Sequence, residues 1–208
     1  MLTGIKKFLL LMVGILWMPA LVFVFKDQLL LFVHQSPTLD AIYAFSLSQI
    51  TGLTVAGQAI LQFLGNLFII MFLPKYAVFF YFLRESKSDA LALVLGAAGG
   101  MFLSMLVNYI CGCLLGFLFR RLLKSSDTLE KWLQKWGASL VFLGYLIPIG
   151  FPHGLVSVLS GVAHVKFKRF VLAVFCGSLA YFTILYVIYV NCSARIEPIL
   201  KKYVEIFH

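Results

Sequence analysis

The chain has 208 residues, of which 62% are hydrophobic and only 12% are charged. A soluble domain of this length would expose too much apolar surface, so the composition predicts an all-α integral membrane protein. The formal net charge is +9. We expect this excess positive charge to set the orientation in the membrane and to contact anionic lipid headgroups. We expect no nucleic-acid partner.

The N-terminal segment begins like a signal peptide but is longer than one. Lys6 and Lys7 precede an apolar run from residue 8 to residue 25. That run exceeds the usual signal-peptide core of about 7 to 15 residues, and bulky residues stand where a small-residue cleavage site belongs. We therefore expect an uncleaved transmembrane anchor helix within residues 1–33.

A first structural repeat is expected at residues 34–119, where a mixed, interfacial helix precedes an apolar run. The run stops at Pro74 and Lys75 and resumes as a piece too short to cross again. Because proline ends a helix and backbone in lipid needs internal hydrogen bonds, this pattern predicts a re-entrant hairpin. The alternative is one ordinary spanning helix between residues 41 and 73. Four amides, Gln49, Gln58, Gln62 and Asn66, make the preceding segment half polar, so it lies in the interface or lines a cavity.

Residues 90–119 form the clearest transmembrane span, because they include no charged residue. Small and polar residues recur there at every fourth position: Gly96, Gly100, Ser104, Asn108, Gly112 and Gly116. Each step of four advances about 40° around a helix, so the stripe winds along the surface. Small residues let helices approach closely in lipid. We expect the four glycines to pack against neighbouring helices, whereas Asn108 either joins that packing or contacts a substrate.

A second repeat is expected at residues 120–192. It opens with a connector that combines Trp and Lys residues, which is typical of an amphipathic helix on a membrane surface. Residues 137–161 are then apolar but interrupted by prolines and glycines, Pro148 among them, which predicts a second re-entrant hairpin. A span at residues 170–190 follows, with Gly177 as a packing position. A polar tail occupies residues 193–208.

Charge predicts how these segments are oriented. Two basic residues at the N-terminus, five in the connector and three just before residue 170 make ten of the 17 in the chain. Short cytoplasmic loops are enriched in Lys and Arg, so these stretches are expected to face the cytoplasm and the C-terminus to face outward. The two repeats are then inverted relative to each other. Such an arrangement places a transport site between facing hairpin tips.

The run GAAGGMFLSMLVNYICGCLLG resembles the glycine-rich helix of the DedA superfamily, also called the VTT or SNARE-associated domain, with Tyr109 in register. The stretch from Trp136 to Tyr181 is similar to that family's second half, with matches at Pro148, Gly161, Lys168, Arg169, Phe170, Gly177 and Tyr181. The resemblance covers residues 72–189. It implies an inverted-repeat fold with two re-entrant hairpins and three to four spanning helices. It also implies translocation or scrambling of phospholipid or polyprenyl-phosphate headgroups in a bacterial inner membrane.

The chain departs from the family at charged positions. The family's tip arginines fall here on Tyr145 and Phe151, and its two acids fall near Lys75 and Ser104. Two functions therefore stay open. The first is DedA-like movement of lipid headgroups. The alternative is a non-transporting membrane protein that supports envelope assembly or a partner complex, as a homo-oligomer or with another membrane protein.

We expect Lys75 and His153 to lie near each other at the hairpin tips and to bind the substrate, with Tyr145, Asn108 and Pro148 beside them. Titratable groups at this depth are costly and are usually kept for function. Lys75 could instead extend to a lipid headgroup, and His153 could satisfy freed carbonyls. Because the ordinary pKa of histidine is about 6.5, transport through His153 is expected to depend on pH between roughly 5 and 8.

Catalytic and metal-binding patterns do not stand out in the sequence. We find no Ser/His, paired-Asp or HExxH constellation, so we expect neither an enzyme nor a cofactor. Cys111 and Cys113 are two residues apart on a predicted helix and point in different directions, which argues against a metal pair. All four cysteines are expected to be small apolar fillers rather than disulfide partners.

Overall fold

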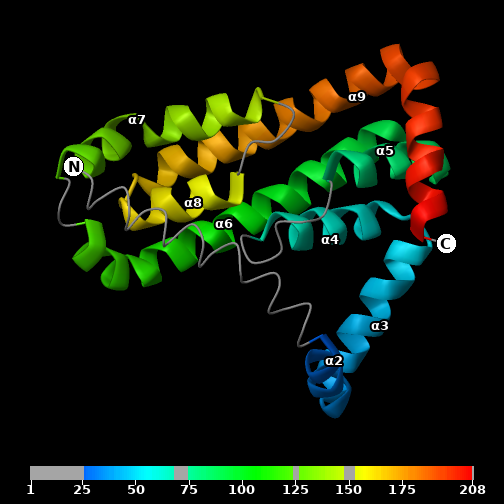
Figure 1. The fold of residues 1–208 in the computed structure, drawn as a ribbon, viewed down its shortest axis with the longest axis horizontal. Coiled ribbons are helices and arrows are strands. Elements are labelled where there is room, and N and C mark those ends of the chain that lie inside the picture. Colours follow the sequence, from blue (N-terminus) through cyan, green and yellow to red (C-terminus); the bar gives the residue numbers. More distant parts are fainter. Residues whose placement is uncertain (1–25, 68–74, 124–126, 148–152, 208) are drawn as a thin grey trace.

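The computed structural model describes residues 26–67, 75–123, 127–147 and 153–207 (Figure 1). Every regular element in these ranges is an α-helix, which confirms the predicted fold class. The helices are α2 (Lys26–Gln35), α3 (Pro37–Thr51), α4 (Val55–Asn66), α5 (Lys75–Glu85), α6 (Ala90–Leu123), α7 (Asp127–Tyr145), α8 (His153–Val162) and α9 (Phe167–Phe207). Most of the expected anchor helix within residues 1–33 lies outside the described residues.

Two of these helices are long and apolar enough to cross a membrane. Their apolar parts are Ala90–Gly116 within α6 and Phe167–Ser193 within α9. They correspond to the spans predicted at residues 90–119 and 170–190, and they identify the chain as an integral membrane protein. Beyond its apolar part, α9 continues to Phe207, so the polar tail is helical as well.

The chain bends by 113° between α3 and α4. Gly52 caps the end of α3, and Leu53 has a φ of 50°, in the left-handed region. Thr54 then caps α4 by accepting a hydrogen bond from the backbone N–H of Gly57 at 3.0 Å. One uninterrupted helix across residues 41–73 is therefore wrong, because local capping ends one helix and starts another.

The amide-rich segment is the first leg of the first hairpin. It forms α4, which packs beside α5 and against α6 (Figure 1). The sequence predicts this segment in the interface or along a cavity, with the hairpin in the apolar run that follows. In the structure three of the four amides, Gln58, Gln62 and Asn66, lie in the hairpin itself, whereas Gln49 lies in α3. Residues 68–74, between the two legs in the sequence, lie outside the described residues.

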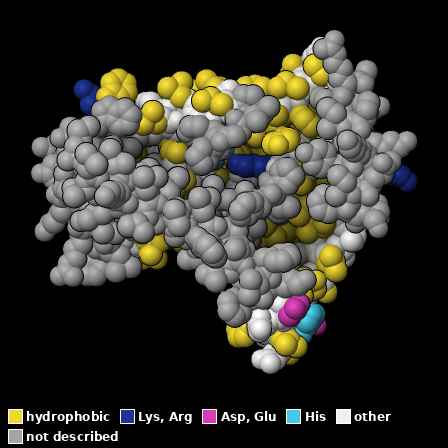
Figure 2. All heavy atoms as spheres, viewed as in Figure 1, with side chains coloured by type: hydrophobic (Ala, Val, Ile, Leu, Met, Phe, Trp, Pro, Cys, Tyr) yellow, Lys and Arg dark blue, Asp and Glu magenta, His cyan; other side chains and the backbone are white. Residues whose placement is uncertain are grey.

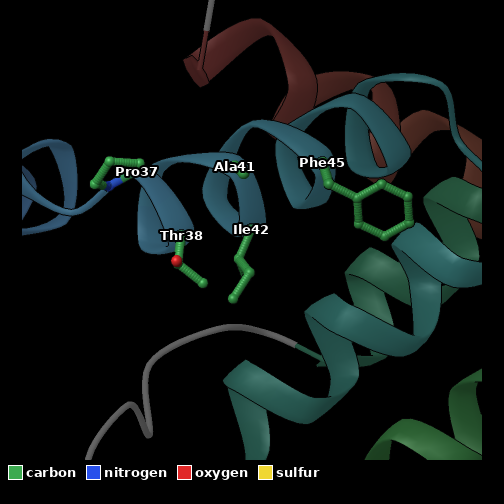
Figure 3. A pocket seen from close by; sticks show the side chains of 5 residues that line it. All are labelled: Pro37, Thr38, Ala41, Ile42 and Phe45. Carbon is green, nitrogen blue, oxygen red and sulfur yellow. The ribbon is translucent and has the colours of Figure 1, made fainter.

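The arm made by α2 and α3 projects from the rest of the molecule (Figure 1). α3 has no buried residue, and a shallow hollow of about 560 Å³ runs along it (Figure 3). The hollow is lined by Pro37, Thr38, Ala41, Ile42 and Phe45. An open, mostly apolar surface on a helix that bends away from the hairpin fits the interfacial position predicted for this segment.

The second hairpin is made by α7 and α8, which pack against each other. The connector and the first leg were expected to be separate, yet α7 runs through both as one helix of 19 residues. Gly137 does not break it, because its missing side chain lets the helix pack closely: a Cβ there would lie 2.7 Å from a methyl group of Val165. Pro148 lies outside the described residues.

The small-residue stripe of α6 holds one leg of each hairpin. A Cβ on Gly100 would lie 2.0 Å from the carbonyl oxygen of Ala59 in α4, and a Cβ on Gly112 would lie 2.1 Å from that of Val158 in α8. Backbones can approach this closely only at glycine. Because the stripe winds around α6, its first half contacts α4 and its second half contacts α8.

These contacts also set the direction of the helices. They pair in rising order along the chain: Val55 with Gly96, Ala59 with Gly100, Val158 with Gly112, and Val162 with Gly116. Both α4 and α8 therefore run parallel to α6, one after the other. The end of α4 and the start of α8 meet near the middle of α6.

The remaining packing follows a crossed pattern. α4 and α8 contact α6, while α7 and α5 contact α9. Each hairpin thus touches both spans, once with its first leg and once with its second. In the first hairpin the first leg packs on α6, and in the second hairpin the first leg packs on α9, as the predicted inversion of the two repeats requires. The repeat boundaries at residues 34–119 and 120–192 stay a prediction.

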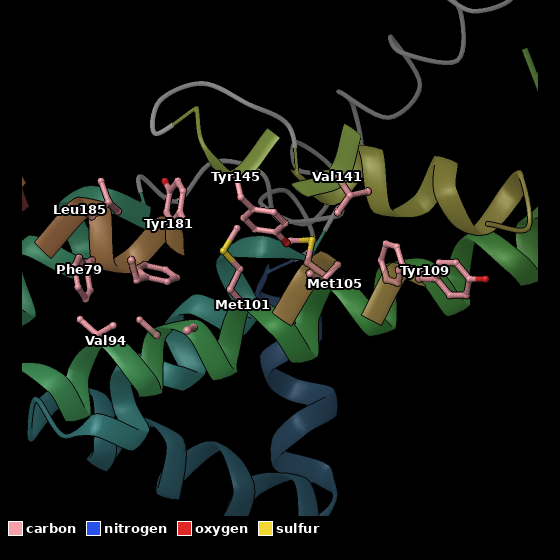
Figure 4. Packing of buried hydrophobic residues seen from close by; sticks show 14 of the residues in the cluster. Phe79, Val94, Met101, Met105, Tyr109, Val141, Tyr145, Tyr181 and Leu185 are labelled. Carbon is pink, nitrogen blue, oxygen red and sulfur yellow. The ribbon is translucent and has the colours of Figure 1, made fainter. Parts of the chain in front are cut away.

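Aromatic and sulfur-containing side chains fill the space between the spans and the hairpins (Figure 4). Phe79 of α5, Met101 and Met105 of α6 and Phe182 of α9 are fully buried. The rings of Phe79 and Phe182 lie 5.0 Å apart and join α5 to α9. The hydroxyl of Tyr109 donates a hydrogen bond to the carbonyl of Val165 at 2.6 Å, which joins α6 to the segment before α9.

Candidate functional site at the two hairpin tips

The second legs of the two hairpins begin with the same local sequence pattern. α5 begins at Lys75 and α8 at His153, and a proline precedes each of them in the sequence. Proline suits the start of a helix, where its missing N–H is not needed. The first N–H groups of a helix lack intrahelical partners and carry a partial positive charge. Both tips are therefore electropositive before any side chain is considered.

The two tips are joined by a direct contact between Lys75 and His153. Lys75 Nζ lies 3.3 Å from His153 Nδ1, although the residues are 78 positions apart. A charged ammonium can only donate, so Nδ1 accepts and the imidazole is neutral in this arrangement. The expectation that these two residues stand close together is confirmed by this distance, while their role in substrate binding is a separate question.

Lys75 has no carboxylate partner in the described part of the chain. The ion pairs found there are His34 with Asp40 and Arg84 with Glu85, both at the surface. His153 is buried and Lys75 is partly buried. Figure 2 shows basic side-chain atoms in a recess near the middle of one face, surrounded by hydrophobic and undescribed atoms. A cation in such surroundings favours an anionic ligand.

Two tyrosines enclose the ring of His153. The Tyr145 ring is 4.6 Å away and the Tyr181 ring is 5.5 Å away, measured between centroids. Tyr145 lies on α7 above Met101 and Met105 of α6 (Figure 4) and has almost no exposed surface. Val141 and Val156 border the same cluster and leave no room for a water molecule beside the two rings. The histidine is thus held by aromatic packing on two sides.

A row of three buried amides leads along α4 to the same place. Gln58, Gln62 and Asn66 follow one another at intervals of four, so they share one face of α4. Gln62 Nε2 donates to the carbonyl oxygen of Lys75 at 3.0 Å. Asn66 Nδ2 donates to the Gln62 carbonyl oxygen at 2.6 Å. The row therefore fixes the first residue of α5 against the end of α4.

Asn108 connects this row to α6. Its Nδ2 donates to the carbonyl oxygen of Asn66 at 2.9 Å, and its side chain is fully buried. This bond satisfies a carbonyl at the end of α4, where intrahelical partners run out. The structure thus gives Asn108 a packing role near the tips, and a contact with substrate stays a prediction.

The three amides of α4 are not among the site residues predicted from the sequence. Their spacing of four was a usable signal, because it put Gln58, Gln62 and Asn66 on one helix face. What that face contacts depends on Lys75 and Asn108, which lie in other helices. Tyr181 matched the family pattern but was not proposed as a neighbour of His153. Pro148, which was proposed, lies outside the described residues.

No cluster of three or more potential metal ligands occurs within the described residues. Cys111, Cys113, Cys176 and Cys192 are all free thiols. Cys113 lies in the packed seam of α6, with its Sγ 3.5 Å from the carbonyl oxygen of Gly161 in α8.

Comparison with known proteins gives one family. The model of the VTT domain matches residues 68–190, which is more than half of the chain. The matched segment includes α5 to α8 and most of α9, and it leaves out the amide-bearing α4. Neither a curated protein nor a solved structure matches the chain significantly. This integral membrane protein belongs to the VTT domain family, the family of DedA and SNARE-associated Golgi proteins.

Proposed function

We propose that this protein moves the phosphate-bearing headgroups of membrane lipids across the bilayer, and that the headgroup binds between the two hairpin tips. The contact of Lys75 with His153 carries the proposal, since it joins the tips of two different hairpins, which the charge distribution predicts to enter from opposite sides. A headgroup bound there can be released toward either side when one hairpin moves relative to the other. Polyprenyl-phosphate and phospholipid headgroups share the phosphate group that this site would recognise.

Charge supports a phosphate as the ligand. Lys75 supplies a full positive charge, and two helix N-termini add partial charges at the same point. The described part of the chain offers Lys75 no carboxylate, so a phosphate would supply the compensating charge. The neutral imidazole of His153 accepts from Lys75 and holds the ammonium at the tip until the ligand arrives.

Transport in liposomes tests this function. The purified protein is reconstituted with lipids that carry a fluorophore on an acyl chain, and a reagent that cannot cross the bilayer quenches the outer leaflet. Wild-type protein is expected to expose labelled lipid from the inner leaflet. Lys75→Met should slow this movement by about 10- to 150-fold, the factor expected for one charge-assisted hydrogen bond. Lys75→Arg keeps the charge and should retain most of the rate.

Lys87 provides the matched control. It is an exposed lysine on the segment between α5 and α6, so Lys87→Met removes the same charge away from the tips and should leave transport unchanged. Equal rates for Lys75→Met and wild type would contradict the proposed site. A wild-type protein that moves no lipid would instead favour a non-transporting role in envelope assembly or in a partner complex.

The membrane and the orientation are part of the proposal. We propose a bacterial inner membrane, with the N-terminus and the basic connector at residues 120–135 in the cytoplasm. The uneven distribution of lysine and arginine supports this orientation.

A further inference from the structure

Gln58 differs from the other amides of its row. Its side chain has no exposed surface, and neither its Nε2 nor its Oε1 has a hydrogen-bond partner among the described residues. Gln62, one turn further along the same face, is equally buried but binds the carbonyl of Lys75. Gln58 and Gln62 are therefore both buried glutamines on α4, but only the amide of Gln62 has a hydrogen-bond partner.

An unpartnered buried amide is costly. Leaving a donor or an acceptor without a hydrogen bond inside a protein destabilises the fold, whereas an apolar side chain of the same size does not. Leucine is similar in size to glutamine and has no polar group that needs a partner. The glutamine at this position is therefore better explained by a group that binds to it than by packing.

The position of Gln58 relates it to the phosphate site. Four residues of helix rise by about 6 Å, so Gln58 lies about that far from the level of Gln62 and Lys75. Ser104 adds a second unpartnered polar group, since its buried Oγ also has no partner among the described residues. Ser104 follows Gly100 by one turn on α6, and Gly100 contacts Ala59, the neighbour of Gln58.

The chemistry of an amide selects the ligand. A primary amide offers both a donor and an acceptor but no charge, and a hydroxyl group offers the same pair. A quaternary ammonium has no hydrogen to donate, and a primary ammonium is repelled by Lys75. A hydroxyl carried on the alcohol part of a headgroup lies a few ångströms from its phosphate, which matches the separation between the two levels.

We propose that Gln58, with Ser104 about one helical turn nearer the tips, is a hydroxyl-binding subsite that makes the protein prefer headgroups whose phosphate carries a polyol, such as glycerol or a cyclic sugar alcohol. This inference rests on the proposed function, because it assumes that the phosphate binds at Lys75. It goes beyond it by naming the part of the ligand that the amide-bearing α4 recognises. α4 lies outside the segment matched to the family.

The test compares two lipids of equal charge and nearly equal size in the liposome assay. Phosphatidylglycerol carries two hydroxyls on a three-carbon alcohol, and phosphatidylpropanol carries none. Wild-type protein should move phosphatidylglycerol about three- to tenfold faster, the factor for one neutral hydrogen bond. Phosphatidylinositol distinguishes the sources of the hydroxyl: a preference for it over phosphatidylglycerol indicates a ring polyol, and the reverse indicates glycerol.

Two variants complete the experiment. Gln58→Leu should move both lipids at the rate of phosphatidylpropanol and should unfold in detergent at the wild-type temperature or above. Gln62→Leu is the matched control: it removes the bond to the Lys75 carbonyl, so it should lower the unfolding temperature. If Gln58→Leu proves too unstable to reconstitute, the glutamine is structural and the inference is overturned.

The outcomes separate the inference from the proposed function. Equal rates for phosphatidylglycerol and phosphatidylpropanol in the wild type overturn the subsite, with Gln58 then binding water only, and leave headgroup transport standing. A preference that survives in Gln58→Leu also overturns it. Failure of the wild type to move any lipid overturns both.

Discussion

Gly177 of α9 leaves the space that the ring of Tyr145 occupies on α7. A Cβ on Gly177 would lie 2.4 Å from Cδ2 of Tyr145, too close for any side chain. The same ring packs against His153, with 4.6 Å between centroids. A span, a hairpin leg and a hairpin tip are therefore linked through one aromatic side chain, and His153 in turn contacts Lys75.

Gly177→Ala should accordingly displace the Tyr145 ring and disturb His153. We expect a loss of about 1–3 kcal/mol in stability, as for other overpacked cores, together with slower headgroup transport. Thermal unfolding in detergent and the liposome assay measure the two effects. Adding Tyr145→Leu to Gly177→Ala should restore part of the stability, because the ring that clashes is gone, but it should not restore transport. Recovery of both would show that Tyr145 does not position His153.

Alanine substitutions at two neighbouring glycines of α6 are expected to change stability in opposite directions. A Cβ on Gly100 would lie 2.0 Å from the carbonyl oxygen of Ala59, whereas a Cβ on Gly99 would meet nothing within 4 Å. Gly99→Ala should raise stability by up to about 1 kcal/mol, because alanine favours a helix. Gly100→Ala should lower it by about 1–3 kcal/mol by forcing α4 away. The amount of folded protein and its unfolding temperature test the pair. Similar effects of the two substitutions would mean that the α4–α6 seam is not close-packed.

The contact between the tips can be tested without any transport assay. In a background that lacks the four native cysteines, Lys75→Cys and His153→Cys are combined and treated with dibromobimane, which fluoresces strongly once it bridges two thiols. We expect fluorescent protein from the double variant and almost none from either single variant. As a control, His153→Cys combined with Lys87→Cys should not be bridged. Absence of bridging between positions 75 and 153 would show that the two hairpin tips do not lie in contact.

Orientation is tested by labelling from outside the cell. In the same cysteine-free background, Thr128→Cys lies within the basic connector and is expected to react with an impermeant thiol reagent only after the membrane is opened. His208→Cys should react in intact cells, because the C-terminal side carries balanced charge. Labelling of position 128 in intact cells would reverse the proposed orientation.

Much of this architecture could be predicted because membrane proteins leave strong local signals. Charge-free length predicted the spans in α6 and α9, and the small residues between Gly96 and Gly116 predicted close packing. Proline beside Lys75 and His153 predicted the two tips, and the predicted inversion of the repeats led us to expect that the tips meet. Each of these signals lies within one segment, so a single sequence is enough to see it.

The rest depends on contacts between segments. The break before Thr54 was missed because it depends on local capping, which is hard to distinguish from a surface loop. The periodicity of the amides in α4 indicated a shared face, but their partners lie in α5 and α6. The link from Gly177 to Tyr145 joins residues 32 positions apart. No pattern within either helix identifies the other.

The parallel docking of α4 and α8 on α6 also has a consequence for biogenesis. Chains are synthesised from the N-terminus, so α4 leaves the ribosome before the helix that shields its amides and its carbonyls exists. α8 leaves afterwards and finds its seam on α6 already in place. Gln58, Gln62 and Asn66 therefore remain unshielded, at the membrane surface or beside the insertion machinery, until the part of α6 with Gly100 and Asn108 has been synthesised. Both hairpins also pack on α9, which is made last, so the fold is complete only when α9 is in place.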